Sequence, residues 1–263
     1  MIGTLAGSFL ESGARRNFLQ QLLIEQEQER SEALLLNVLP ALVADRLKGG
    51  EEVVDAFDEV SVLFADIVDF TLVSATLSPH KLVTFLNEVF SRFDELAEKH
   101  ELEKIKTMGD AYMVVGGVPT PRTNHAERIA EMALDMQGEA ARMSEEFGRG
   151  IQLRIGLNTG PVVAGVIGRR KFSYDLWGDT VNTASRMEAV AIPGKIQVTE
   201  AVHERLKDRY RFEGPTAVLV KGKGEMVTYC LTGRRTISAT EDVELGTDGT
   251  MVLRPPPSAT GSP

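Results

Sequence analysis

Hydrophobic and polar positions divide the chain into an N-terminal helical stretch and a longer region of mixed strands and helices. Residues 1–16 carry glycine, serine and alanine without a period, and we expect them to be flexible. Residues 17–50 predict a helical segment for signalling or dimerisation, although the polar run 25–32 interrupts its leucines. A coiled coil and a plain helical spacer are both open interpretations. Pro40 predicts a kink or the start of a second helix.

From residue 51 to residue 233 apolar runs alternate with amphipathic stretches, which predicts one folded domain. Because hairpins are mixed with helical crossovers and no strict βαβ repeat occurs, we expect an α+β fold, a sheet covered by helices. The tail 234–263 is rich in Thr, Gly and Pro and is expected to be disordered. Strands are expected at 60–65, 104–107, 111–115, 151–158, 162–167 and 196–199, and helices after Ser78, over 124–147, after Asp179 and over 200–206.

Composition narrows the function classes. The net charge of −9 argues against a broad nucleic-acid-binding surface. The single cysteine, Cys230, excludes an intrachain disulfide and favours a reducing compartment; we interpret it as a small apolar residue of a strand. No run of 18 apolar residues occurs. We expect a cytoplasmic location, and the chain fits equally the cytosolic part of a membrane-anchored protein. The histidines lack metal-ligand spacing, and we expect all of them at the surface: His80, His100, His125 and His203.

Two aspartates are the strongest chemical signal. Asp66 ends the apolar strand 60–65, and Asp110 lies at the tip of the hairpin formed by 104–115. If the hairpin lies beside that strand, the two carboxylates meet at one edge of the sheet and repel each other unless a cation separates them. Two-metal sites suit phosphoryl transfer. Taken singly, each residue is better interpreted as a capping or turn aspartate.

The turn that follows Asp66 leads toward a helix through Phe70 and Thr71, and its backbone N–H groups are suited to cradle a triphosphate. No Walker A motif occurs in the chain.

Five motifs in order resemble the class III nucleotidyl cyclases, and the resemblance covers residues 52–233. It implies a ferredoxin-like or palm-type sheet and the adenylyl cyclase type, bacterial and homodimeric. The stretch 34–47 is similar to the helical transducing element that precedes many such domains. The motifs are Phe64–Thr71, Glu103–Asp110, Leu153–Gly160, Tyr174–Met187 and Val220–Gly224.

The resemblance implies that Asp66 and Asp110, with the backbone of Ile67, bind two Mg²⁺ or Mn²⁺ ions. Lys106 and Asp175 match the pair that reads the purine. Their chemistry suits adenine, because a lysine donates to ring N1 and an aspartate accepts from the exocyclic amine. Guanine presents the opposite pattern.

The family pattern assigns the remaining roles to residues of the second half. Asn182 and Arg186 match the ribose-positioning and transition-state residues, and they lie four positions apart on the expected helix. Lys221 matches the lysine that holds the terminal phosphates, while Phe70 and Thr71 fall in the triphosphate turn. The resemblance also implies a homodimer with two shared active sites, because metal aspartates and transition-state residues come from different subunits. ATP is the expected substrate, and an upstream sensor or membrane domain is a further expected partner.

Three alternatives stay open at this point. A guanylyl cyclase is disfavoured by Lys106 and Asp175. A catalytically inert regulatory domain would lack one of the matched residues, all of which are present. A palm-type nucleotidyl transferase would share the paired acids but not the helix with Asn182 and Arg186.

Overall fold

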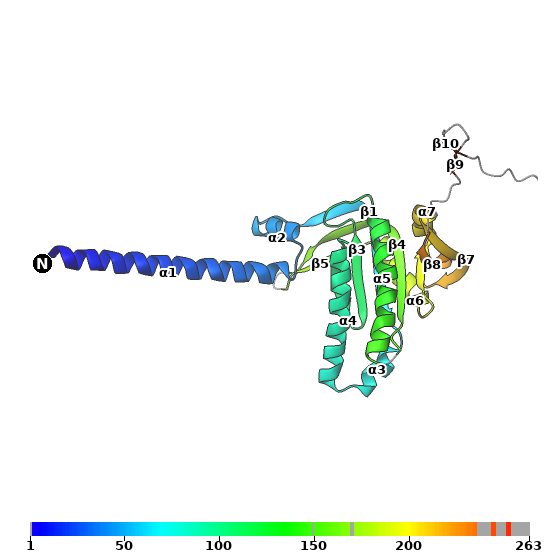
Figure 1. Cartoon of the computed structure of the whole chain (residues 1–263), viewed down its shortest axis with the longest axis horizontal. Helices are drawn as coiled ribbons and strands as arrows, with labels where there is room; N and C mark the ends of the chain where they lie inside the picture. Colours follow the sequence, from blue (N-terminus) through cyan, green and yellow to red (C-terminus); the bar gives the residue numbers. More distant parts are fainter. Residues whose placement is uncertain (1, 149, 169–170, 236–242, 246–250, 254–263) are drawn as a thin grey trace, which may run out of the picture.

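The computed structural model describes residues 2–148, 150–168, 171–235, 243–245 and 251–253 (Figure 1). Its helices are α1 Ile2–Leu36, α2 Ala41–Lys48, α3 Phe70–Thr76, α4 Pro79–Lys99, α5 His125–Glu146, α6 Asp179–Val190 and α7 Glu200–Leu206. Its strands are β1 Val54–Ile67, β2 Glu103–Met108, β3 Ala111–Gly116, β4 Leu153–Ile167, β5 Ser173–Trp177, β6 Ile196–Thr199, β7 Tyr210–Val220, β8 Gly224–Arg234, β9 Val243–Leu245 and β10 Met251–Leu253.

An eight-stranded mixed sheet forms the centre of the molecule. Seven of its strands follow the order β2-β3-β1-β4-β6-β8-β7, and β5 pairs with the C-terminal end of β4. The portion β2-β3-β1-β4, with α4 and α5 as crossovers, has the strand order of a ferredoxin-like unit. The predicted α+β fold with a helix-covered sheet is therefore confirmed.

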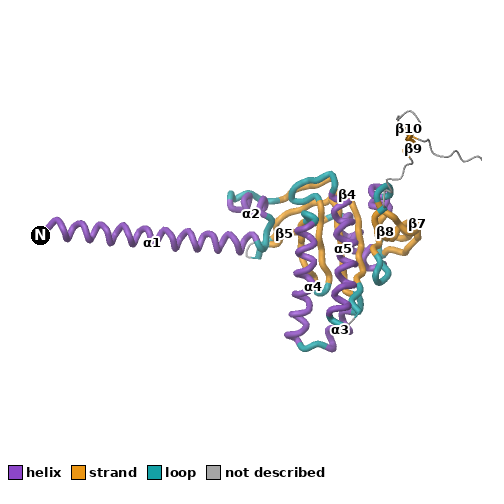
Figure 2. The backbone as a smooth tube through the Cα atoms, viewed as in Figure 1, coloured by secondary structure: helices purple, strands orange, loops and turns teal. Residues whose placement is uncertain are grey.

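Side chains that alternate along β1 build two cores on opposite faces of the sheet. Leu63 and Ala65 belong to the core that α4 and α5 cover, and Figure 2 shows these two helices running side by side. Val62 and Phe64 belong to the other core, which includes residues of α2 and α6. Because Asp66 follows Phe64 by two positions, its side chain leaves the sheet on the side of α6.

Three strand predictions are wrong at their boundaries. The expected strands 151–158 and 162–167 form one strand, because Pro161 is accommodated as an irregularity in the pairing of β4 with β1 rather than as a turn. The expected strand 60–65 is the centre of the longer β1, whose first half also pairs with β4. The hairpin of β2 and β3, the strand β6 and the helix α7 lie where the sequence predicted them.

The N-terminal segment is more regular than the sequence indicated. α1 begins at Ile2, so residues 2–16 are helical and not irregular, and Pro40 precedes a second helix as expected. Figure 1 shows α1 extending away from the sheet. Within the described residues no helix has both the length and the apolar character needed to cross a bilayer. Large apolar side chains stay exposed along α1: Phe18, Leu19, Leu22, Leu23 and Ile24.

α2 packs as part of the second core. Leu39, Val43 and Ala44 are buried there together with residues of the sheet. Arg46 donates to Asp55 of β1 at 2.6 Å. Residues before the predicted boundary at 50 and 51 therefore pack against the sheet that follows it.

At the other end of the chain, β8 ends at Arg234, the first residue of the expected disordered tail, and within that tail β9 pairs with β10. The rest of the tail lies outside the described residues. Cys230 is half-buried in β8, and its Sγ lies 3.4 Å from Gln197 Oε1.

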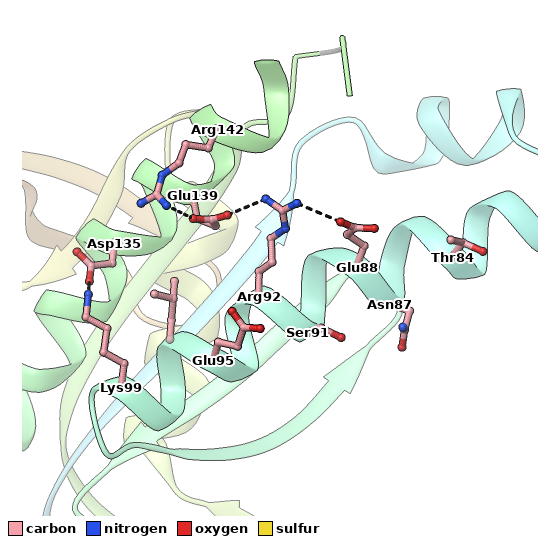
Figure 3. Close-up of a pocket in the computed structure, with 11 residues that line it drawn as sticks. Thr84, Asn87, Glu88, Ser91, Arg92, Glu95, Lys99, Asp135, Glu139 and Arg142 are labelled. Carbon is pink, nitrogen blue, oxygen red and sulfur yellow. Dashed lines mark hydrogen bonds and ion pairs between the residues drawn. The ribbon is translucent and has the colours of Figure 1, made fainter. Parts of the chain in front are cut away.

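Paired charges line a groove of about 700 Å³ between α4 and α5. Arg92 donates to Glu88 and Glu139, and Arg142 pairs with Glu139 (Figure 3). Arg92 also donates to Glu146 at the end of α5. These ion pairs connect α4 to α5 across the groove, and we call this set of paired charges the clamp.

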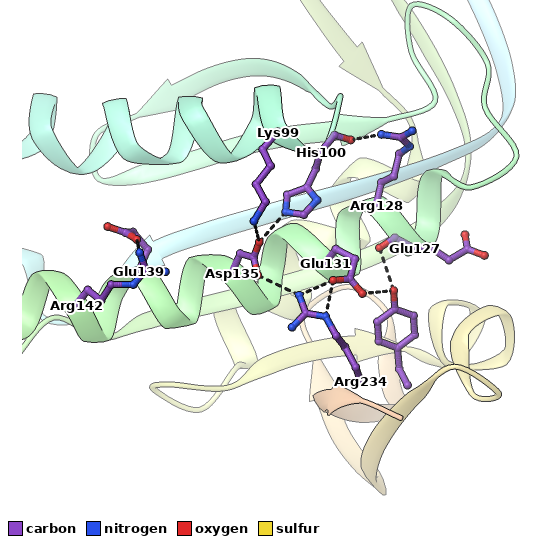
Figure 4. A network of polar contacts seen from close by, with 10 residues as sticks. Lys99, His100, Glu127, Arg128, Glu131, Asp135, Glu139, Arg142 and Arg234 are labelled. Atoms are coloured by element: carbon purple, nitrogen blue, oxygen red, sulfur yellow. Dashed lines mark hydrogen bonds and ion pairs between the residues drawn. The ribbon is translucent and has the colours of Figure 1, made fainter. Parts of the chain in front are cut away.

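Asp135 extends this clamp toward β8. It accepts from Lys99 at 2.7 Å, His100 at 2.9 Å and Arg234 at 3.1 Å (Figure 4). Burial alone would raise the pKa of Asp135, but these three donors outweigh it and lower the pKa to about 2. Arg234 also donates to Glu131 at 2.6 Å, which ties the last strand of the main sheet to α5.

The surface prediction for the histidines is right only for His80. His125 is fully buried at the start of α5, where its Nδ1 lies 2.8 Å from Ser61 Oγ. His203 stacks on Tyr229 with ring centroids 3.9 Å apart, and His100 joins the Asp135 clamp. These rings supply apolar surface as well as a polar tip, so helix periodicity alone could not place them.

The buried imidazole of His125 predicts a pH-dependent stability. Burial and the charge of Arg205 lower its pKa below 6.5, while Glu59 and Glu127 oppose the shift. Below about pH 6.5 the unfolded chain binds this proton before the folded chain does, so the free energy of unfolding falls until the folded pKa is reached. The slope from this one proton is at most about 1.4 kcal/mol per pH unit.

Urea unfolding at one protein concentration, between about pH 7.5 and pH 5.5, measures this slope. His125→Gln should flatten it relative to the wild type, and His80→Gln, an exposed control, should leave it unchanged. Equal slopes in the wild type and His125→Gln would contradict the assignment.

The exposed apolar side chains of α1 predict association with a second copy of the helix. Deleting residues 1–31 retains α2 and its core contacts, so the domain should stay folded but dissociate at higher protein concentration. Leu19→Gln with Leu23→Gln should reproduce the loss, and the polar pair Gln20→Ala with Glu27→Ala is the control. Analytical ultracentrifugation across a dilution series measures the dissociation constant; an unchanged constant would rule out this role.

Candidate active site

Asp66 and Asp110 converge at one end of the sheet. Asp66 stands opposite Ala111 of β3, and Asp110 immediately precedes Ala111 at the tip of the β2–β3 hairpin. Gly109 makes the tight turn with a φ of 66°, which residues with a side chain rarely adopt. The structure thus brings together the two carboxylates that the sequence placed at one edge.

The pKa of Asp110 reflects its burial and its closeness to Asp66. Burial raises this pKa to about 6, with further contributions from a hydrogen bond to Asp66 and from its negative charge. The charge of Arg154 acts in the opposite direction. Two carboxylates in this arrangement hold a proton or need a cation.

Arg154 and Glu188 complete this edge, and sequence reasoning missed both. Strand β4 places Arg154 opposite Asp66, and its Nη2 donates to Asp66 Oδ2 at 2.6 Å. Its Nε forms an ion pair with Glu188 Oε1 at 3.3 Å. Burial raises the pKa of Glu188, and so does the charge of Asp66, while Arg154 opposes them. The available signal was that Arg154 is the only charged residue of β4, and nothing in the sequence marked Glu188.

Lys106 and Asp175 form a second pair. Lys106 Nζ lies 2.5 Å from Asp175 Oδ2, and the other carboxylate oxygen accepts from the backbone N–H of Leu176 at 2.9 Å. The pair joins β2 to β5, which are far apart in the order of the sheet but in contact in space. Both side chains are partly exposed, so a planar ligand can reach their polar atoms.

Helix α6 presents different groups on different sides. Asn182 and Arg186 are exposed, and the described part of the chain offers neither side chain a hydrogen bond or ion pair. Glu188 instead contacts Arg154 beside Asp66. At 100° per residue, positions 186 and 188 differ by about 200° around the helix. Arg186 therefore points away from the carboxylates of its own chain.

The remaining predicted residues lie on turns. Lys221 is exposed in the connection between β7 and β8, and neighbouring Lys223 pairs with Asp179 at the start of α6. Phe70 and Thr71 open α3 directly after Asp69, whose φ is 55°. Phe70 packs partly against the first core, whereas Thr71 is exposed. Their predicted contacts with phosphates stay predictions.

The oxygen atoms at the carboxylate edge fit a divalent cation. In the described chain, no group of three or more His, Cys, Asp or Glu side chains is arranged to hold a metal. Asp66, Asp110 and the backbone carbonyl of Ile67 offer hard oxygen ligands, which Mg²⁺ and Mn²⁺ prefer. Burial, and after it the neighbouring Asp66, raise the pKa of Asp110, so a positive ion beside it would stabilise its charged form. Water and phosphate oxygens would complete such a coordination sphere.

Comparisons with known proteins agree with this geometry. A family model described as the adenylate and guanylate cyclase catalytic domain matches residues 52–233. An adenylate cyclase from Mycobacterium tuberculosis is 52% identical over 217 residues, which are 82% of this chain and 49% of that protein. Guanylate cyclase soluble subunit beta-2 from Rattus norvegicus is 44% identical over 223 residues, 84% of this chain and 32% of that protein. The chain thus spans about half or less of these relatives.

A solved structure shows that the fold is similar as well. The guanylate cyclase domain of RhGC from Catenaria anguillulae, in complex with GTP, is 37% identical with a TM-score of 0.67 and covers 69% of this chain and 100% of that domain. The family match includes both paired acids, the Lys106–Asp175 pair and all of α6. The chain therefore belongs to the family of adenylate and guanylate cyclase catalytic domains.

Proposed function

We propose that this domain converts ATP to 3′,5′-cyclic AMP and pyrophosphate at the interface of a homodimer, with two Mg²⁺ or Mn²⁺ ions in each site. The proposal rests mainly on the observation that the functional side chains of α6 leave the helix on different sides. Glu188 faces the carboxylate edge of its own chain, whereas Asn182 and Arg186 face away and are free to serve a second chain. Two-fold symmetry then creates two equal shared sites.

At the carboxylate edge, Asp66, Asp110 and the Ile67 carbonyl would hold the cations. Bound divalent ions would lower the pKa of the ATP 3′-hydroxyl and neutralise charge on the triphosphate. The Arg154 guanidinium, whose Nη2 lies 2.6 Å from Asp66 Oδ2, would place a positive charge beside the same phosphates. Phe70 and Thr71 would present backbone N–H groups to the same phosphates.

At the base end, Lys106 would donate to adenine N1 and Asp175 would accept from the 6-amino group. Their contact at 2.5 Å fixes both polar groups side by side before the base arrives. Guanine carries an acceptor at O6 and a donor at N1, so the same pair would face mismatched atoms. Because relatives of both specificities match this chain, the preference for ATP rests on these two side chains.

The reaction is an in-line displacement. The 3′-oxygen attacks the α-phosphorus, the bond from that phosphorus to the bridging oxygen breaks, and pyrophosphate leaves. The 3′-hydroxyl proton has three possible acceptors: Asp66, water and the nucleotide itself. Arg186 would stabilise charge on the α-phosphoryl oxygens, a contribution of about 2.7–4 kcal/mol for groups of this kind. Asn182 would orient the ribose, and Lys221 would hold the terminal phosphates.

Mixing two inactive variants tests the shared site. Asp66→Ala removes a metal ligand and Arg186→Ala removes the transition-state charge, so each alone should form little cyclic AMP. Half of randomly mixed dimers contain one intact site out of two, so about a quarter of wild-type activity should return. The control mixes each variant with itself. If activity does not return, the two halves do not come from different chains.

Exchanging the base-reading pair tests the substrate. Lys106→Glu with Asp175→Cys should raise the ratio of kcat/KM for GTP over ATP by at least about tenfold, because the hydrogen-bonding pattern is reversed. Lys104→Glu, an exposed neighbour on the same strand, is the control for added charge. A variant that loses activity on ATP without gaining any on GTP would show that the pair does not select the purine.

A further inference from the structure

We propose that Glu188 is a positioning residue that holds the Arg154 guanidinium in place beside Asp66 and thereby sets how readily that carboxylate accepts a cation. The inference rests on the proposed function, because it concerns the same carboxylate edge. It gives α6 a second task in addition to presenting Asn182 and Arg186.

One guanidinium stands between two largely buried carboxylates. Arg154 Nη2 lies 2.6 Å from Asp66 Oδ2, and Arg154 Nε lies 3.3 Å from Glu188 Oε1. The side chains of Asp66 and Glu188 are only 16% and 15% exposed. Water screens these pairs little, so each carboxylate affects how strongly Arg154 is attracted to the other.

The backbone that carries Glu188 has no room to move toward β4. Gly156 of β4 lies against it so closely that an added Cβ would come within 1.9 Å of Glu188 N and 2.6 Å of Ala184 O. Gly156 also lies two residues after Arg154 on the same side of the strand. The backbone of Glu188 is therefore held in place, so its carboxylate can fix the position of the Arg154 guanidinium.

The sharing has a direct consequence for cation binding. With Glu188 in place, Arg154 is attracted to two carboxylates, so it neutralises the charge of Asp66 only in part. With Glu188 neutralised, Arg154 would pair with Asp66 alone and would compete with a cation for the same oxygens. Arg186 should be unaffected, because its side chain leaves α6 on the opposite side.

Mn²⁺ binding to the full chain tests this step without a reaction. Electron paramagnetic resonance of free Mn²⁺ should show about tenfold weaker binding for Glu188→Gln than for the wild type. Glu95→Gln, the same change at an exposed position of α4, should bind as the wild type does. Unchanged affinity in Glu188→Gln would overturn the proposal.

A double-mutant cycle separates positioning from charge at a distance. In an Arg154→Gln background, Glu188→Gln should change Mn²⁺ affinity much less, because the residue through which it acts is gone. The same tenfold loss in both backgrounds would mean that Glu188 acts only as a nearby negative charge.

Placing Glu188→Gln on one or the other chain of a mixed dimer then distinguishes an effect on the carboxylate edge from a general defect of α6. Glu188→Gln on the Arg186→Ala chain, which supplies the carboxylates of the intact site, should remove most of the returned activity. The same change on the Asp66→Ala chain, which supplies Asn182 and Arg186, should leave it. An equal loss in both placements would show a general defect of α6 and overturn the proposal. If the parent mixture regains nothing, the shared site fails, and the Mn²⁺ cycle alone decides the role of Glu188.

Discussion

The mutual repulsion of Asp66 and Asp110 is the constraint on which the rest of the site depends. The register of β1 with β3 places the two carboxylates together, and the pKa of Asp110 rises to about 6 because burial and its neighbour both disfavour the charge. Arg154 relieves only part of this excess, since it also pairs with Glu188. An edge with this electrostatic character favours divalent cations, and the hard oxygen donors suit Mg²⁺ or Mn²⁺.

Helix α6 is the structural basis for the proposal that two copies of the domain share each site. Its packing against β4 directs Glu188 toward its own carboxylate edge, and helical geometry then turns Arg186 about 200° away. Lys106 and Asp175 are distant from each other in sequence, yet the contact between β2 and β5 brings them together within one chain. The exposed apolar side chains of the long α1 are available for the association that the proposed shared sites would require.

Sequence reasoning located the elements whose pattern is local. The hairpin around Gly109, the strand 196–199 and the helices after Asp179 and Glu200 could be predicted because turn residues and periodicity fix them. Asp66 and Asp110 could be singled out because each follows or interrupts an apolar run. The roles assigned to Asn182, Arg186 and Lys221 came from the family resemblance and stay proposals.

Features that depend on tertiary packing could not be read from the chain. Pro161 has the appearance of a turn residue until β1 pairs across it, with a bulge at Asp58 and Glu59. His125 has a polar side chain on an amphipathic helix, and only the contact with Ser61 shows why it is buried. Glu188 is one of many helix acids, and Arg154 makes it distinctive only once β4 and α6 are packed together. Burial of α2 in the second core likewise required the folded sheet.

The most direct test of the account is a crystal structure of the chain with Mn²⁺ and a non-hydrolysable ATP analogue, with the manganese located by anomalous scattering. The account predicts manganese bound by Asp66 and Asp110 of one protomer, the analogue's phosphates on it, and Arg186 of the second protomer at the α-phosphate. Manganese bound elsewhere, or an α-phosphate contacted by Arg186 of the protomer that holds the metal, would contradict it.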